Sequence, residues 1–136
     1  MLKEQLQGTK YRLTNQRQIL LEEIQKVHTH PTAEEVYEIV RKRIPNVSFA
    51  TVYRNLDFLS QNGFIIKLHT KDKKTRYDGY SDPHLHLCCK KCGYVVDIFD
   101  CKCKLSASED LEETGFSPDL SCLEIPGLCK KCNSKN

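Results

Sequence analysis

Residues 48–63 read SFATVYRNLDFLSQNG, a stretch with the pattern of a single amphipathic helix. Val52, Leu56 and Leu59 recur at the spacing of helical turns, so their side chains share one face. The pair Asn62-Gly63 is a common signal for the end of a helix. The stretch therefore predicts a helix that starts near Ser48 and buries its valine and leucine side chains.

Two further helices are predicted before this stretch, and a hairpin after it. Thr14 is a candidate N-cap for apolar residues at helical spacing, namely Ile19, Leu20, Ile24 and Val27. Thr32 and Glu35 form a capping box at the start of the second helix. FIIKLHT (64–70) and TRYDGY (75–80) are typical of two strands around the turn KDKK. Three helices followed by a hairpin with a basic tip is the order of a winged helix-turn-helix.

The cysteines divide the chain. It has 136 residues, a net charge of +3 and eight cysteines, all from Cys88 onward. Glycine and proline break the periodicity around residue 80, so we expect domains at 1–79 and 80–136. Two domains of this size each have a small hydrophobic core, so we expect additional stabilisation from a metal ion or from dimerisation. Because neither an export signal nor a membrane-length apolar run is present, we expect a soluble cytoplasmic protein without a membrane partner. In that compartment paired cysteines usually bind metal.

The predicted helix of residues 48–63 carries polar residues off its apolar face. Thr51, Tyr53 and Arg54 could contact bases or phosphates in a DNA groove. Flanking phosphates could be neutralised by Lys10, Arg12, Arg17, Lys71, Lys73 and Lys74. The alternative is an ordinary solvated face, and the lysine-rich hairpin favours DNA over that alternative.

Two Cys-Lys-Lys-Cys knuckles lie far apart in the second half. Cys89 and Cys92 form one, Cys129 and Cys132 the other, and four thiolates in a tetrahedron suit structural zinc. The alternative is a redox pair, which usually needs only one such motif at the start of a helix. Between the knuckles we expect a strand, a short helix and a strand, at YVVDIFD (94–100), SASEDLEETG (106–115) and LSCLEI (120–125).

Histidines and aspartates suggest a second metal site of a different kind. In an extended segment His84 and His86 point to the same face and can share one ion. His30, Asp78 and Asp97 could add further ligands. Three imidazoles and two carboxylates suit Fe²⁺, Mn²⁺ or Zn²⁺ better than a soft, thiolate-binding ion. The alternative is a pair of surface histidines with no metal.

Five motifs together resemble the ferric uptake regulator (Fur) family. They are HPTAEEVY (30–37), ATVYRNL (50–56), RYD (76–78), HLHLCCKKCG (84–93) and LEIPGLCKKC (123–132), and the resemblance extends from about Arg12 to Cys132. It implies an α+β chain with an N-terminal winged helix-turn-helix domain followed by a small α/β dimerisation domain with structural zinc. It also implies a homodimeric, metal-dependent repressor that binds an inverted repeat in double-stranded DNA. Such a protein is not an enzyme and takes no small organic substrate.

The resemblance also implies roles for individual residues. The structural zinc ligands are Cys89, Cys92, Cys129 and Cys132. The regulatory Fe²⁺ or Mn²⁺ ligands are His30, Asp78, His84, His86 and Asp97. Arg12, Tyr53 and Arg54 match DNA-contacting positions.

Two aspartates favour peroxide sensing within this family. Asp78 stands where zinc-uptake regulators tend to carry cysteine, and Asp97 stands where iron-uptake regulators tend to carry glutamate. Arg54 instead favours iron-uptake regulation, since arginine is usual at this position in iron-uptake regulators. An iron-uptake regulator is therefore the alternative function. If the chain is a peroxide sensor, the resemblance implies that peroxide leads to oxidation of a ligand histidine, His30 or His84.

Four cysteines have no family role: Cys88, Cys101, Cys103 and Cys122. We expect these four cysteines to be small buried apolar side chains.

Two rival functions stay open. One is a redox enzyme that uses Cys101 and Cys103, and the other is a regulator that holds structural zinc only.

Overall fold

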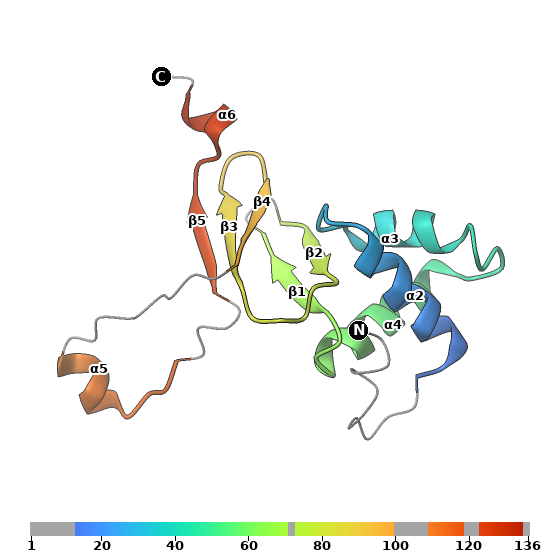
Figure 1. Cartoon of the computed structure of the whole chain (residues 1–136), viewed down its shortest axis with the longest axis horizontal. Coiled ribbons are helices and arrows are strands. Elements are labelled where there is room, and N and C mark those ends of the chain that lie inside the picture. Colours follow the sequence, from blue (N-terminus) through green and yellow to red (C-terminus); the bar gives the residue numbers. More distant parts are fainter. Residues whose placement is uncertain (1–12, 71–72, 100–108, 119–122, 135–136) are drawn as a thin grey trace. The chain divides into compact units, whose positions relative to one another are not determined.

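The computed structural model describes residues 13–70, 73–99, 109–118 and 123–134. The chain divides into two compact units, Met1–Ser81 and Asp82–Asn136. Helices and strands occur in both units, in agreement with the α+β class (Figure 1). Among the described residues, none of the helices has the length and apolar character needed to cross a membrane.

Three capped helices begin the described part of the first unit. They are α2 (Asn15–Lys26), α3 (Ala33–Val40) and α4 (Phe49–Gln61). The predicted N-caps Thr14 and Thr32 are confirmed, and Ser48 is the N-cap of the helix that was expected to start near it. Each of the three side chains accepts a hydrogen bond from the backbone N–H three residues later. The capping box of Thr32 and Glu35 is also confirmed.

The hairpin of β1 (Ile66–His69) and β2 (Thr75–Asp78) follows the helices. The two strands pair antiparallel, with Ile66 opposite Asp78 and His69 opposite Thr75. β2 packs against α2 and α3, and its Tyr77 is fully buried in the same core as Val52, Leu56 and Leu59 of α4. Three helices and a hairpin in this order form the predicted winged helix.

One face of α2 differs from the prediction. Leu20, Leu21 and Ile24 are its buried residues, whereas Ile19 is only half-buried. Val27 lies beyond the helix, as its C-cap in an extended conformation. The predicted buried face left out Leu21. A helix that packs against several elements buries more than one row of side chains, so its buried face is wider than a single row predicts.

A three-stranded sheet forms the framework of the second unit. Its strands are β3 (Leu85–Cys89), β4 (Val95–Ile98) and β5 (Glu124–Gly127), in the order β4-β3-β5. β4 runs antiparallel to β3 and β5 runs parallel to it (Figure 1). The helices are α5 (Glu109–Thr114), which ends before Gly115 as predicted, and α6 (Lys130–Asn133).

The third strand starts later than predicted. LSCLEI at 120–125 was expected to be a strand, but β5 begins at Glu124 and runs through Pro126 to Gly127. Residues 120–122 of that prediction lie outside the described residues. A proline is tolerated here because β5 lies at the edge of the described sheet, where one side of the strand needs no hydrogen-bond donor.

Gly79 is required by its surroundings and holds the end of β2 against α2. A Cβ atom at this position would lie 2.9 Å from the backbone of both Ile24 and Gln25.

Because backbone atoms cannot easily move aside, we expect Gly79→Ala to destabilise the protein by about 1–3 kcal/mol. Urea unfolding measures this change. Gly127→Ala is the matched control, because an added Cβ there meets nothing within 4 Å. Equal midpoints for the two variants would contradict the expectation.

Candidate metal centres and nucleic-acid surface

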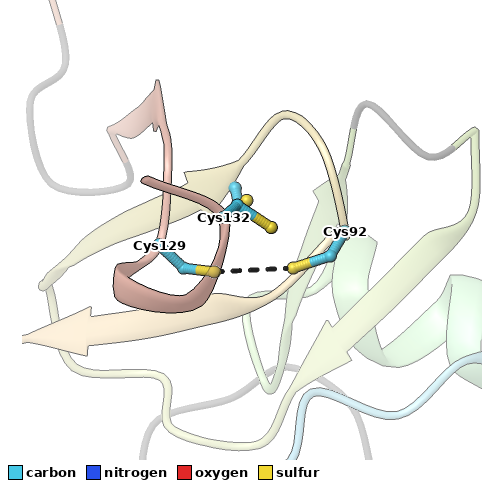
Figure 2. Close-up of side chains that lie close together, drawn as sticks. Cys92, Cys129 and Cys132 are labelled. Atoms are coloured by element: carbon cyan, nitrogen blue, oxygen red, sulfur yellow. Dashed lines mark hydrogen bonds between the residues drawn. The ribbon is translucent and has the colours of Figure 1, made fainter. Parts of the chain in front are cut away.

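The four knuckle cysteines come together in the second unit. Their Sγ atoms all lie within 4.8 Å of one another. Cys89 ends β3, Cys92 lies in the turn that follows, and Cys129 and Cys132 lie at the start of α6 and within it. Figure 2 shows the thiols of Cys92, Cys129 and Cys132 pointing toward one another.

Local backbone geometry prepares each knuckle. Gly93 adopts a φ of 78°, a left-handed conformation that favours glycine, and its N–H donates to the Cys89 carbonyl. In the second knuckle the N–H of Cys132 donates to the Cys129 carbonyl over 3.0 Å. Each pair of thiols is thus turned to one side by a tight turn. The fold brings the two turns together because β3 and β5 are hydrogen-bonded neighbours.

The distances and the acidities of the thiols suit a tetrahedral ion. The Sγ atoms of Cys92 and Cys129 lie 3.7 Å apart. Zinc–sulfur bonds of about 2.3 Å imply sulfur–sulfur edges of about 3.8 Å. Backbone hydrogen bonds from Cys129 and Cys92 lower the pKa of Cys89 to about 6, which favours a thiolate. Desolvation and the neighbouring thiols raise the pKa of Cys132 to about 12, because a second thiolate is costly there without a cation.

A histidine and an aspartate form a buried pair in the first unit. Nε2 of His30 lies 3.5 Å from Oδ2 of Asp78, and both side chains are more than nine-tenths buried. The second carboxylate oxygen, Oδ1, accepts a hydrogen bond of 2.9 Å from the N–H of Tyr80. Asp78 therefore keeps one oxygen directed at the imidazole.

His30 is held in an unfavourable backbone conformation. Its φ is 53°, in the left-handed region, and it precedes a proline, which disfavours helical conformations at that place. Such a residue costs about 1–3 kcal/mol and persists only where its surroundings impose it. Here Arg76 donates to the His30 carbonyl over 3.2 Å, and the Tyr77 N–H donates to the Pro31 carbonyl over 2.9 Å. The turn is thus tied to β2, the strand that carries Asp78.

Two histidines and an aspartate converge in the second unit. Nε2 of His84 and Nε2 of His86 each lie 3.3 Å from the same oxygen of Asp97, Oδ1. Strand geometry explains this: the histidines are two residues apart, so they share a face, and Asp97 of β4 is the direct partner of His86. Both imidazoles are completely buried. The prediction that the two histidines point to one side is confirmed, and the alternative of two surface histidines is wrong.

A hydrogen bond on the far side of one ring orients it. Nδ1 of His84 lies 2.7 Å from the carbonyl oxygen of Asp82. A carbonyl can only accept, so Nδ1 carries a proton, and in the neutral imidazole Nε2 then has a lone pair on the side of Asp97. Metal-binding histidines commonly have this arrangement. The donor chemistry is nitrogen and carboxylate oxygen, which suits Fe²⁺ or Mn²⁺.

The outer surface of α4 presents the predicted DNA-contacting residues. Tyr53 is 43% exposed and Arg54 is exposed, whereas Thr51 is half-buried. The Thr51 hydroxyl accepts from the Ser48 hydroxyl over 2.9 Å and from the Arg54 guanidinium over 3.4 Å. Thr51 thus helps to hold Arg54. The sequence analysis did not single out Phe49, which is 40% exposed on the same surface, one helical turn before Tyr53. The spacing of the two aromatic residues along the helix could have indicated that they share a face.

Arg17 makes contacts within the first unit that the sequence did not predict. Its Nε donates to Oδ1 of Asn55 over 3.1 Å, and its guanidinium lies 3.6 Å from the centre of the Phe58 ring. These contacts join α2 to α4. Lys73 and Lys74 at the hairpin tip are exposed and match the prediction of a basic tip.

Several predicted residues lie outside the described part of the chain. They are Arg12, Lys10, Lys71, Cys101, Cys103 and Cys122. Cys88 is described: it is buried, and burial raises the pKa of its thiol, as expected of a small apolar side chain. Phe99, which the sequence did not single out, stacks on His84.

Comparisons with known proteins show the family of the chain. The model of the "Ferric uptake regulator family" matches residues 8–125. A peroxide-responsive repressor, PerR, of Staphylococcus saprophyticus is 36% identical, over 96% of this chain and 88% of its own. The peroxide operon regulator of Bacillus subtilis is 34% identical, over 97% and 91%. The structure of the Campylobacter jejuni peroxide stress regulator aligns with a TM-score of 0.67 and 32% identity, over 96% of this chain and 95% of that one. The chain belongs to the ferric uptake regulator family, a family of transcriptional regulators.

Proposed function

We propose that this protein is a metal-dependent transcriptional repressor that senses peroxide. The observation that carries the proposal is the convergence of His84 and His86 on one oxygen of Asp97. That arrangement is a preformed part of a nitrogen–oxygen metal site, and its carboxylate is the aspartate that favours peroxide sensing. The names of the relatives, a peroxide-responsive repressor and a peroxide operon regulator, support it further.

The regulatory metal ion takes its ligands from both units. His84, His86 and Asp97 form one part, and the buried pair of His30 and Asp78 forms the other. Ferrous iron bound there would supply the redox chemistry that activates peroxide. The net change inserts one oxygen atom of hydrogen peroxide into an imidazole C–H bond of His30 or His84 and releases water. The ring loses two electrons and peroxide gains them.

Metal occupancy controls DNA binding by linkage. Because the two ligand groups belong to different compact units, an ion bound to both favours only those arrangements that bring them together. Oxidation of a ligand histidine removes a metal–nitrogen bond and weakens that preference. The repressor then releases its operator, which we propose to be an inverted repeat in double-stranded DNA read by two copies of α4.

Zinc in the four-cysteine cluster stabilises the second unit, which also forms the homodimer. One face of its sheet is apolar and hollowed by about 430 Å³, with Leu87, Tyr94, Val96, Ile125 and Leu128 among its lining residues. Leu87, Tyr94 and Leu128 are 40–60% exposed, which is unusual for large apolar side chains grouped on one face. A second copy of the chain would cover them.

Removing one zinc ligand tests the structural site. Cys132→Ser should lose one zinc ion per chain and destabilise or dissociate the dimer, because a small domain draws much of its folding free energy from a structural ion. Metal analysis and sedimentation measure the two effects. Cys88→Ser is the matched control for the zinc content, since Cys88 lies in the same strand as Cys89 but not in the cluster. A full zinc content in a dimeric Cys132→Ser protein would contradict the assignment.

Two substitutions separate base reading from phosphate contact. Arg54→Ala should weaken binding to the operator by about 1–3 kcal/mol if its guanidinium reads a guanine. Lys73→Ala should weaken binding to all sequences and lower the slope of log K against log salt by about 1. Fluorescence anisotropy with operator and random DNA measures both. Equal losses of Arg54→Ala on the two DNAs would show that Arg54 contacts phosphate only.

The peroxide response is tested by mass spectrometry of the histidine peptides together with DNA binding. After anaerobic loading with Fe²⁺, peroxide should add about 16 Da, one oxygen atom, to His30 or His84 and release DNA. Protein loaded with Mn²⁺ should bind DNA and stay unmodified. Asp97→Glu should keep metal-dependent DNA binding and lose the response, because the longer side chain can occupy the place that peroxide needs. If iron-loaded protein binds DNA in step with Fe²⁺ yet shows no oxidation, the iron-uptake alternative replaces this one.

A further inference from the structure

An exposed phenylalanine lies against one of the buried histidines of the second unit. Phe99 directly follows β4, two residues after Asp97. Its ring centre lies 4.8 Å from that of His84, and the two ring planes differ by 25°, which is a stacked arrangement. The His84 ring also contacts that of His86, at 4.3 Å between centres and 53° between planes.

The burial of the two stacked rings is unequal. The imidazole of His84 is completely buried, whereas Phe99 remains 47% exposed. A phenylalanine that served only to fill a core would bury most of its own ring. Here a half-exposed ring stacks on a completely buried imidazole, so we expect it to contribute to the position and shielding of His84.

Stacking adds a constraint to the contacts made by the nitrogen atoms of the ring. Nδ1 of His84 lies 2.7 Å from the Asp82 carbonyl and Nε2 lies 3.3 Å from Oδ1 of Asp97, so these contacts act at the edge of the ring. Phe99 packs against the face of the ring and resists its tilting. Together the edge and face contacts direct Nε2 toward Asp97. His86 is held differently, because it lies within β3 and is paired directly with Asp97.

We propose that Phe99 is a positioning residue for the regulatory metal, acting through His84. The proposal rests on the proposed function, since it assumes that His84 is a ligand. Hydrogen-bonding partners that orient a metal ligand from behind typically contribute 10–100-fold to metal affinity, and we expect a stacked ring to act at the lower end of that range. The effect should fall on His84 and leave His86 unchanged.

The test measures Mn²⁺ affinity by electron paramagnetic resonance and the ring signals of His84 by NMR in metal-free protein. Phe99→Ala should weaken Mn²⁺ binding roughly 10-fold. It should also move the His84 ring protons downfield, because the shielding by the stacked ring is lost, with the His86 tautomer unchanged. Phe99→Tyr should restore both properties. Phe116→Ala, which removes an exposed phenylalanine after α5, is the matched control and should behave as wild type.

A second variant separates positioning from folding. Phe99→Leu keeps apolar bulk but lacks a flat ring, so it should fold with the wild-type melting temperature and still bind Mn²⁺ more weakly. Wild-type affinity in folded Phe99→Leu and Phe99→Ala proteins would overturn the inference. His84→Ala tests the assumption beneath it: if that variant binds Mn²⁺ as wild type does, the proposed regulatory site itself is wrong.

Discussion

Four thiols held in one small volume are the constraint on which the second unit depends. The described part of this unit buries few large apolar side chains, so packing alone supplies little stability. Cys92 and Cys129 are 37 residues apart in sequence, and their sulfurs lie 3.7 Å apart. An ion that joins the two knuckles would close this long loop and help to hold β5 beside β3, its parallel partner. The lowered pKa of Cys89 and the raised pKa of Cys132 fit a site in which a cation would compensate the charge of neighbouring thiolates.

The histidine and aspartate groups are prepared by other means. The position of His30 is fixed by a left-handed turn that β2 holds through Arg76. His86 lies in β3 and His84 directly precedes that strand, so the alternation of side chains in an extended segment places both on one face. These groups offer nitrogen and oxygen whereas the knuckles offer sulfur, so the two kinds of site differ in the metal ions that they favour. A soft thiolate site would retain zinc, and a harder site would suit Fe²⁺ or Mn²⁺. Such a difference in ligands suits a protein in which one metal ion is structural and the other is regulatory.

The surface of α4 combines rigid support with available contact groups. Arg17 and Asn55 lock α4 to α2, and the Ser48–Thr51 hydroxyl pair holds the start of the helix. Tyr53 and Arg54 are therefore displayed from a helix whose orientation within its unit is set by buried contacts. Such support allows a change elsewhere in the chain to move the helix as a body, which suits a regulator that binds and releases DNA.

The sequence by itself determined the features that depend on neighbours a few positions away. Helix caps at Thr14, Thr32 and Ser48, the two cysteine turns and the shared face of His84 and His86 are all local, so spacing predicts them. Leu21, the start of β5 and the role of Arg17 escaped prediction, because each is decided by partners on other elements. Only the tertiary structure placed both imidazoles on one oxygen of Asp97 and stacked Phe99 on His84. The pairing of β3 with β4 produces these contacts, and the register of two strands is a property of their packing that no single stretch of sequence contains.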